Sequence, residues 1–246
     1  MTIAVSGLPP APKPAQRAQG VSPFIVMDVM NAAEAIERRG GSVVHMEVGQ
    51  PSAATPASIR AAAARALEDG RIGYTQALGI GSLRARIARH YRDTYGVEVP
   101  AERVVVTTGS SGGFILSFLA CFEPGARIAI TAPGYPAYRN ILTALGLEPV
   151  AIPVGPETRY ALTPELIARA HAERPLAGVL TMSPANPTGV VMTPEAIAAV
   201  AAECRRLGLW YISDEIYHGL TYERPATTAL AADPDAIIVN SFSKYY

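Results

Sequence analysis

A lysine, a carboxylate, a phenol and an amide follow short apolar runs in the second half of the sequence. Lys244 stands in Ser-Phe-Ser-Lys, just after the apolar run 237–239, and Asp214 and Tyr217 stand in Ser-Asp-Glu-Ile-Tyr. Asn186 lies in Ser-Pro-Ala-Asn-Pro-Thr-Gly. A lysine amine can form a Schiff base with an aldehyde, a carboxylate can pair with a protonated ring nitrogen, and a phenol or an amide can contact a ring oxygen. Together these groups suit an aromatic aldehyde that serves as an electron sink.

A glycine- and serine-rich segment, Thr-Gly-Ser-Ser-Gly-Gly at 108–113, separates an apolar run from a predicted helix. The free backbone N–H groups at the start of a helix and the positive end of its dipole favour a bound phosphate. Serine hydroxyls just before Lys244 can add further hydrogen-bond donors. The candidate phosphate ligands are Ser110, Ser111, Gly112, Ser241 and Ser243.

Tyr135, in Ala-Pro-Gly-Tyr-Pro at 132–136, offers an aromatic face on which a ring can stack. Each candidate by itself has an ordinary explanation: Asp214 as a turn cap, Tyr217 as a core residue, and Lys244 as a surface lysine. One phosphate-bearing aldehyde explains all of them together. The cofactor that fits is pyridoxal 5′-phosphate, and the four histidines show no metal-ligand spacing.

Two other ligand or reaction classes use some of the same residues. Gly109, Ser111 and Gly113 fit the G-x-S-x-G pattern of a hydrolase nucleophile elbow. Such a hydrolase also needs an acid and a histidine, and the best pair is Asp214 with His218, only four residues apart. This interpretation leaves the lysine and the amide without roles. Dinucleotide binding is disfavoured because no set of glycines completes the G-x-G-x-x-G spacing.

Short apolar runs, several of them rich in β-branched residues, recur along the sequence. From about residue 100 they alternate with helical segments, which indicates a parallel sheet covered by helices. A ligand of such a sheet lies beyond the carboxyl ends of the strands, where the polar residues above would meet. We therefore predict an α/β fold with a mainly parallel sheet, whose strands are residues 104–106, 128–130, 150–152, 178–180, 210–212 and 237–239.

Three Thr-Pro pairs predict helix starts, because a threonine hydroxyl can cap the first turn and proline suits its first position. They lie at Thr55, Thr163 and Thr193. Two of these helices are followed by glycines, Gly70 and Gly208, that suit a left-handed C-terminal cap.

Composition excludes several classes of protein. The 246 residues include 21 basic and 21 acidic residues without a basic cluster, which argues against a nucleic-acid or membrane-surface partner. No apolar run reaches the length of about 18 residues that a membrane span needs. Cys121 and Cys204 are interpreted as core residues, and so few thiols fit a reducing, cytoplasmic location.

The order of the motifs resembles that of class I and II aminotransferases of fold type I, the aspartate aminotransferase-like group. The similar segments, which extend from roughly residue 22 to the end of the chain, are V-G-Q-P at 48–51, Y-T-Q-A-L-G at 74–79, T-G-S-S-G-G at 108–113, A-P-G-Y-P at 132–136, S-P-A-N-P-T-G at 183–189, S-D-E-I-Y at 213–217 and S-F-S-K at 241–244.

The resemblance implies a role for each matching residue. Lys244 would be the Schiff-base lysine and general base, and Asp214 the partner of the pyridine nitrogen. Asn186 and Tyr217 would contact the ring oxygen. The other implied contacts are the ring stack of Tyr135, the phosphate set Ser110, Ser111, Gly112, Ser241 and Ser243, the substrate carboxylate beside Gly49, and Tyr74 on the phosphate of a neighbouring subunit, which implies a homodimer with shared sites. Family members also tend to have a cis peptide bond at the position of Asn186-Pro187.

The resemblance also divides the chain. Residues 1–49 would form an N-terminal arm and part of an incomplete small domain, and residues 50–246 the cofactor-binding large domain. Family members continue past the lysine with a phosphate-binding arginine, a further strand and most of the small domain. We therefore expect this chain to be the front part of a longer protein.

The implied reaction transfers an amino group between an amino acid and a 2-oxo acid. Lyases, synthases and decarboxylases of the same fold share these motifs and remain alternatives. A non-catalytic cofactor-binding module, as in a transcription regulator, and an inert fragment are alternatives of a different class. Acidic, aromatic and branched substrates all remain open.

Overall fold

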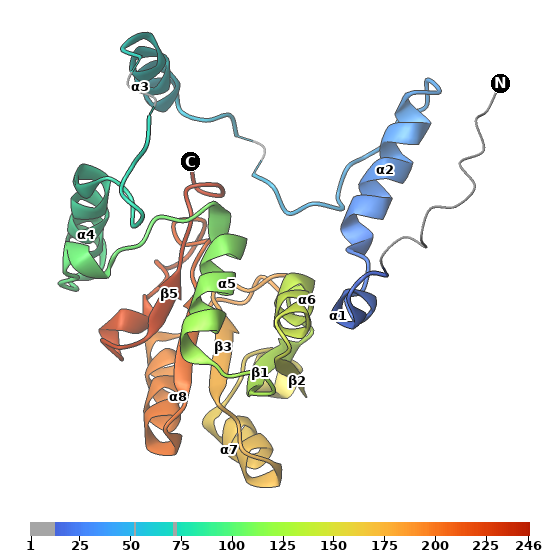
Figure 1. Cartoon of the computed structure of the whole chain (residues 1–246), viewed down its shortest axis with the longest axis vertical. Helices are drawn as coiled ribbons and strands as arrows, with labels where there is room; N and C mark the ends of the chain where they lie inside the picture. The colour runs from blue at the N-terminus through green and yellow to red at the C-terminus, as the bar shows by residue number, and fades with distance from the viewer. Residues whose placement is uncertain (1–12, 52, 71–72) are drawn as a thin grey trace, which may run out of the picture.

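The computed structural model describes residues 13–51, 53–70 and 73–246, so the first twelve residues of the predicted arm lie outside it. Its centre is a five-stranded parallel sheet in the order β2-β1-β3-β4-β5. Figure 1 shows this sheet with helices on both faces. The strands are β1 (Arg127–Ala132), β2 (Glu148–Pro153), β3 (Gly178–Met182), β4 (Trp210–Asp214) and β5 (Ile237–Val239).

One predicted strand is wrong. Residues 104–106 form no strand, although their three valines resemble those of a buried strand. The Val106 N–H donates to the carbonyl of Leu78 at 3.0 Å, so this segment pairs with the chain before α4 instead of the sheet. Val105 is also 49% exposed, so the segment is not buried on both of its faces.

The helices alternate with the strands from α5 onward. The α-helices are α1 (Gln16–Gln19), α2 (Ile25–Glu37), α3 (Ala57–Glu68), α4 (Gly81–Tyr95), α5 (Gly109–Cys121), α6 (Pro136–Ala144), α7 (Pro164–Glu173) and α8 (Pro194–Leu207). Three short 3-10 turns are η1 (Ala101–Arg103), η2 (Pro156–Thr158) and η3 (Ala229–Ala231).

The sheet buries side chains on both faces, as its short apolar strands predict. In β1, Ile128 packs in the cluster formed with α5 and α6, whereas the adjacent Ala129 packs in the cluster formed with α7 and α8. The same alternation occurs in β3 and β4. Cys204 is fully buried in the second cluster, which confirms its interpretation as a core residue.

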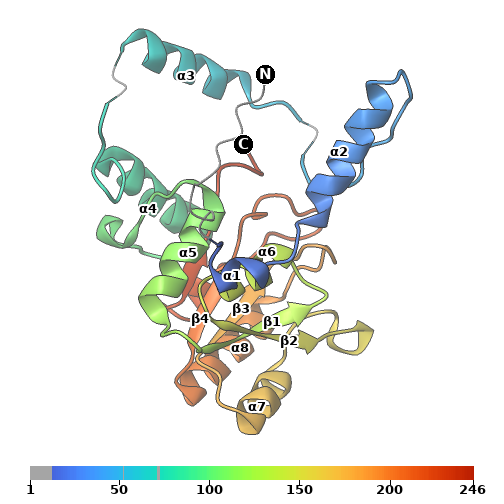
Figure 2. The same cartoon turned by 45° about the vertical axis from the view of Figure 1, so that its right-hand side comes forward.

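The helices of the N-terminal part contact the sheet far less. Figures 1 and 2 show α2 and α3 extending away from it. Ile25, Met27, Val29 and Met30 on α2 are all exposed, so they do not belong to the core of this chain. Within the part of the chain that the structure describes, no helix is long and apolar enough to cross a membrane.

Two of the three predicted threonine caps are confirmed. Thr163 accepts from the N–H of Leu166, and Thr193 from the N–H of Ala196. The third prediction is wrong, because the helix after Thr55 begins one residue later, at Ala57, and has no side-chain cap. Both predicted glycines have the left-handed conformation, with φ of +64° at Gly70 and +68° at Gly208.

The capped and uncapped threonines provide a matched pair of variants. Thr193→Ala should lower the free energy of unfolding by about 1 kcal/mol, because the first turn of α8 loses an acceptor for the Ala196 N–H. Thr55→Ala should change it by less than about 0.5 kcal/mol. Urea unfolding followed by circular dichroism measures both, and equal effects of the two substitutions would contradict the assignment of the caps.

Candidate cofactor site

Polar residues from three separate segments meet beyond the carboxyl ends of the parallel strands. Asn186 follows β3, Asp214 ends β4, and Lys244 lies shortly after β5. Because neighbouring strands run in the same direction, these ends lie along one edge of the sheet. The sheet therefore brings together residues that are far apart in the sequence.

Lys244 lies against two of the predicted site residues. Its Nζ donates to the carbonyl oxygen of Gly49 at 3.1 Å and lies 5.8 Å from the centre of the Tyr217 ring. A Cβ added at Gly49 would lie 3.5 Å from the Tyr217 hydroxyl, so the phenol lies close to this glycine. The amine, the phenol and a backbone carbonyl thus form one local group.

Asp214 is a fully buried carboxylate. Its Oδ1 accepts from the Ile216 N–H at 3.1 Å, and its Oδ2 accepts from the hydroxyl of Tyr138. Burial raises the pKa of Asp214 to about 6, although both hydrogen bonds act in the opposite direction. Among the described residues, no Lys, Arg or His forms an ion pair with it. A buried carboxylate that has only neutral partners is well suited to a cationic group such as a protonated pyridine nitrogen.

Tyr138 is a site residue that the motif analysis missed. It is buried on α6 and packs edge to face with Tyr135, with ring centres 5.3 Å apart. Tyr135 is the residue just before the helix, so the two rings are three positions apart and lie on the same side of α6. This spacing in Tyr-Pro-Ala-Tyr was the available signal, but the partner of Tyr138 is 76 residues away in the sequence.

Tyr135, Tyr217 and Asn186 lie around Asp214. Tyr135 is half-buried. Burial raises the pKa of its hydroxyl, and the nearby Tyr217 and Asp214 raise this pKa further. Burial also raises the pKa of Tyr217, and the nearby Asn186 side chain counteracts part of this rise. The residues predicted to surround a ring are therefore neighbours.

The first turn of α5 has the properties of an anion site. Thr108 precedes the helix without capping it, and the first turn contains no acidic residue, so its N–H groups have no side-chain acceptor. A Cβ at Gly113 would lie 3.5 Å from Val239, which places this turn against the end of β5. Figure 1 shows the segment after β5 beside the start of α5. Ser241 and Ser243, whose hydroxyl oxygens are 2.8 Å apart, lie in that segment.

The structure does not bring Tyr74 to these residues. Its side chain is fully exposed in this chain, before the start of α4. The hydrolase alternative also loses support. His218 contacts Tyr95 and Glu215 instead of Asp214, and Ser111 is exposed at the start of α5. In the described ranges, no group of three or more His, Cys, Asp or Glu residues could hold a metal ion.

These residues fit a pyridoxal phosphate. The fit depends on four features: the Lys244 amine beside the Tyr217 phenol, the buried Asp214 carboxylate with no ionic partner among the described residues, the Tyr135 ring, and the uncapped start of α5. The sequence profile described as "Aminotransferase class I and II" matches residues 42–246.

The chain belongs to this family.

Class I and II aminotransferases depend on pyridoxal phosphate. The asparagine–proline bond at 186–187 is cis, as the resemblance led us to expect, and Ala132-Pro133 and Ser183-Pro184 are cis as well.

Similar proteins and structures are also aminotransferases. The chain is 52% identical over 92% of its length to the valine–pyruvate aminotransferase of Mycobacterium tuberculosis. A crystal structure of an aminotransferase from the same organism matches 96% of this chain with a TM-score of 0.90 and 51% identity. The aspartate aminotransferase of Thermus thermophilus with maleate matches 95% of it with a TM-score of 0.90 and 29% identity.

The matches cover much less of the relatives than of this chain. The chain spans 58% of the valine–pyruvate aminotransferase and about 60% of both solved structures. The sheet and the residues at its edge lie within the matched part.

Asp214→Asn should change how the stability of the cofactor-free chain depends on pH. The pKa of Asp214 is about 6 in the folded chain against an ordinary value of 3.8, so the folded state holds the proton more tightly. Wild-type stability should therefore fall as the pH rises through this interval, because the unfolded chain releases the proton first. Asparagine has no proton to lose, so the stability of the variant relative to wild type should rise by up to about 3 kcal/mol.

Urea unfolding at about half-unit steps across this interval measures the difference. Asp235→Asn is the matched control, because the Asp235 side chain is 86% exposed and its replacement should give a flat difference. An equally flat difference for Asp214→Asn would show that the folded chain does not hold this carboxyl in an unfavourable environment.

Proposed function

We propose that this chain carries the cofactor-binding domain of an aminotransferase that moves an amino group between an amino acid and a 2-oxo acid. The main support for the proposal is that two functional groups lie at the same edge of the sheet. Asp214 is buried and forms no ion pair with a Lys, Arg or His among the described residues, and Lys244 lies beside Tyr217. Family membership supports the same reaction class.

Each residue has a proposed task in holding the cofactor. Lys244 is the point of covalent attachment, Asp214 pairs with the ring nitrogen, and Tyr135 stacks on the ring. Asn186 and Tyr217 contact the ring oxygen, which their mutual proximity supports. The phosphate is held by Ser110, Ser111, Gly112, Ser241 and Ser243, which is supported by the uncapped start of α5 beside the end of β5.

The bound cofactor would supply an electron sink next to the carbon from which a proton is removed. The remaining work belongs to the chain. Asp214 keeps the ring nitrogen protonated, because a buried carboxylate gains most from a cation at that point. Lys244 Nζ moves the proton, and Tyr217 and the Gly49 carbonyl hold this amine at the ring.

We propose valine and pyruvate as the first substrate pair to test. The support is the name of the relative that is 52% identical over 92% of this chain. The aspartate aminotransferase that matches structurally is 29% identical, so acidic substrates form the comparison set. Gly49 would lie beside the substrate carboxylate, because a larger residue there would approach the Tyr217 hydroxyl.

We further propose that two copies of this chain pair and that Tyr74 reaches the phosphate of the partner copy. Its full exposure is consistent with a role outside its own chain. The exposed apolar side chains of α2 are candidates for the same interface. The domain boundary near residue 49 and a cytoplasmic location remain parts of this proposal, the latter supported by the low thiol content.

The sequence allows a sharp test of the attachment point, because its lysines are Lys13 and Lys244. Pyridoxal phosphate added to the purified chain should give an absorbance band above about 400 nm, where a protonated imine of this cofactor absorbs. Borohydride reduction followed by peptide mapping should place the label on Lys244. Lys244→Ala should lose both the band and the label, and Lys13→Arg should keep them.

A label on Lys13 or the N-terminal amine with none on Lys244 would overturn the cofactor site. Amino transfer is measured separately as alanine formed from valine and pyruvate, with aspartate as the comparison donor. A chain that labels Lys244 but transfers no amino group from any donor would retain the site and overturn the proposed reaction.

A further inference from the structure

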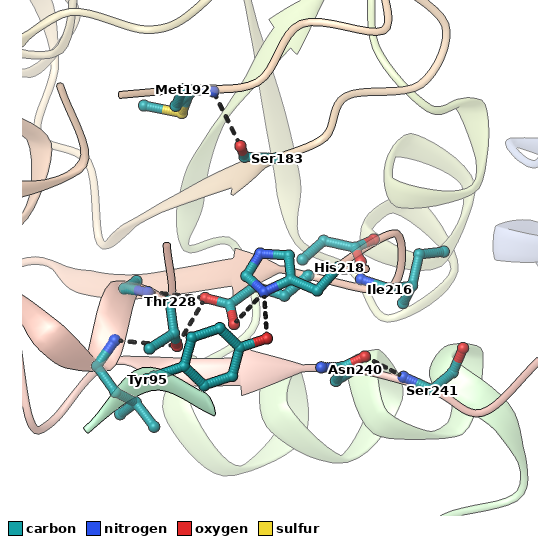
Figure 3. Close-up of polar contacts among 12 residues, drawn as sticks. Tyr95, Ser183, Met192, Ile216, His218, Thr228, Asn240 and Ser241 are labelled. Atoms are coloured by element: carbon teal, nitrogen blue, oxygen red, sulfur yellow. Dashed lines mark hydrogen bonds and ion pairs between the residues drawn. The ribbon is translucent and has the colours of Figure 1, made fainter. Parts of the chain in front are cut away.

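The turn 214–218 carries Asp214 at one end and has Tyr217 near the other, and it is held by a buried polar cluster. This cluster consists of Glu215, His218, Tyr95 and Thr228. Figure 3 shows His218 facing the hydroxyl of Tyr95, with Thr228 nearby. None of these four residues is among the proposed ring contacts.

Glu215 connects the turn to two other segments. Its carboxylate is 1% exposed, and Oε1 accepts from the Thr228 hydroxyl at 3.1 Å and from the Ala229 N–H at 2.8 Å. Its backbone N–H donates to the carbonyl of Val239 at 2.8 Å, at the end of β5. One residue therefore joins the ends of β4 and β5 to the start of η3.

His218 connects the same turn to α4. Its side chain is 3% exposed, and Nδ1 lies 2.8 Å from the Tyr95 hydroxyl and 3.6 Å from Glu215 Oε2. Its backbone N–H donates to the carbonyl of Glu215 at 3.0 Å. Tyr95 is the last residue of α4, so this contact joins a peripheral helix to the site.

Burying these two groups is costly, since Glu215 Oε2 and His218 Nε2 have no hydrogen-bond partner among the described residues. Burial raises the pKa of Glu215 to about 7, with nearby Asp214 adding to the rise, and lowers the pKa of His218 to about 4. A pair of apolar side chains would fill the same space without that cost. We therefore infer that Glu215 and His218 serve a purpose other than stabilising the fold.

The cluster also reaches the segment that leads to Lys244. Tyr91 lies one turn before Tyr95 on α4, with ring centres 5.3 Å apart. Burial raises the pKa of Tyr91, and the nearby Asn240 side chain counteracts part of the rise. Asn240 Oδ1 in turn accepts from the Ser241 N–H at 2.7 Å. The same face of α4 thus contacts one loop of the proposed site and lies near the other.

We propose that Glu215 and His218, with Tyr95, are positioning residues that fix the turn 214–218 so that Asp214 and Tyr217 meet the cofactor. This inference rests on the proposed cofactor site. The turn contains the Ile216 N–H that holds Asp214, so a shift of the turn changes both the carboxylate and the phenol. Small displacements of such groups can lower the reaction rate greatly.

Glu215→Ala tests the inference in the cofactor-free chain. Amide hydrogen exchange at Glu215, Ile216 and His218 should accelerate by about tenfold or more, because the acceptor for Thr228 and Ala229 is lost. Exchange in β3 should change much less. Glu215→Gln keeps an oxygen at the same place and should restore slow exchange.

Ile167→Ala is the control for general destabilisation, because Ile167 is fully buried on α7 and, among the described residues, no hydrogen bond joins α7 to the turn. It should loosen the amides around α7 and leave the turn protected. If Glu215→Ala leaves the three amides as protected as in wild type, or if Ile167→Ala exposes them equally, the positioning role is wrong.

Tyr95→Phe is a milder variant that keeps the ring and removes the hydroxyl at His218. It should accelerate exchange in the turn by about fivefold and weaken binding of pyridoxal phosphate by a similar factor. Tyr222→Phe is the matched control, because the Tyr222 side chain is fully exposed, and it should change neither quantity.

The spectrum of the bound cofactor separates positioning from simple support of the fold. Glu215→Ala and Tyr95→Phe should shift the pH midpoint of the absorbance band, whereas Ile167→Ala should not. An unchanged midpoint and unchanged binding in both cluster variants would overturn the inference even if their amides exchange faster. If wild type itself binds no cofactor at Lys244, the proposed function fails, and amide exchange still decides whether the cluster holds the turn.

Discussion

The buried carboxylate of Asp214 is the constraint around which the site is organised. A carboxylate with no exposed surface and no cationic partner among the described residues is unfavourable by itself. Its two hydrogen-bond donors, the Tyr138 hydroxyl and the Ile216 N–H, offset part of that cost. A positively charged group bound at the end of β4 would offset the rest of that cost. The surrounding residues fix the position of this carboxylate.

The sheet provides the rigidity that such a group needs. β4 is paired in register with β3 on one side and β5 on the other, so Asp214 cannot move without its neighbours. The loops that follow these strands then differ in how they are fixed. Lys244 is held by a backbone carbonyl from a distant segment, whereas the turn after Asp214 is held by buried polar side chains. Rigid strands with individually fixed loops are a common way to place functional groups accurately.

Local sequence patterns predicted the helices and strands whose formation depends on neighbouring residues in the sequence. The strands were recognised from short β-branched runs, and the start of α8 from Thr193-Pro194. Thr55-Pro56 has the same local pattern without a cap, and residues 104–106 look like a strand but pair with Leu78. Nothing in the structure explains the missing cap at Thr55, whereas for residues 104–106 the deciding partner is tertiary. Tyr138 was missed for the same reason, because its role appears only when α6 brings it to a carboxylate 76 residues away.

The contact between Lys244 and Gly49 has a consequence for the order of folding. These residues are 195 positions apart, so their contact closes a loop that includes most of the chain. Contacts of such long range follow the formation of local structure, because the entropy of closing the loop is regained only when the sheet is already present. We therefore expect this contact to form after the sheet. A partly folded chain would contain a complete sheet before it contained a complete site.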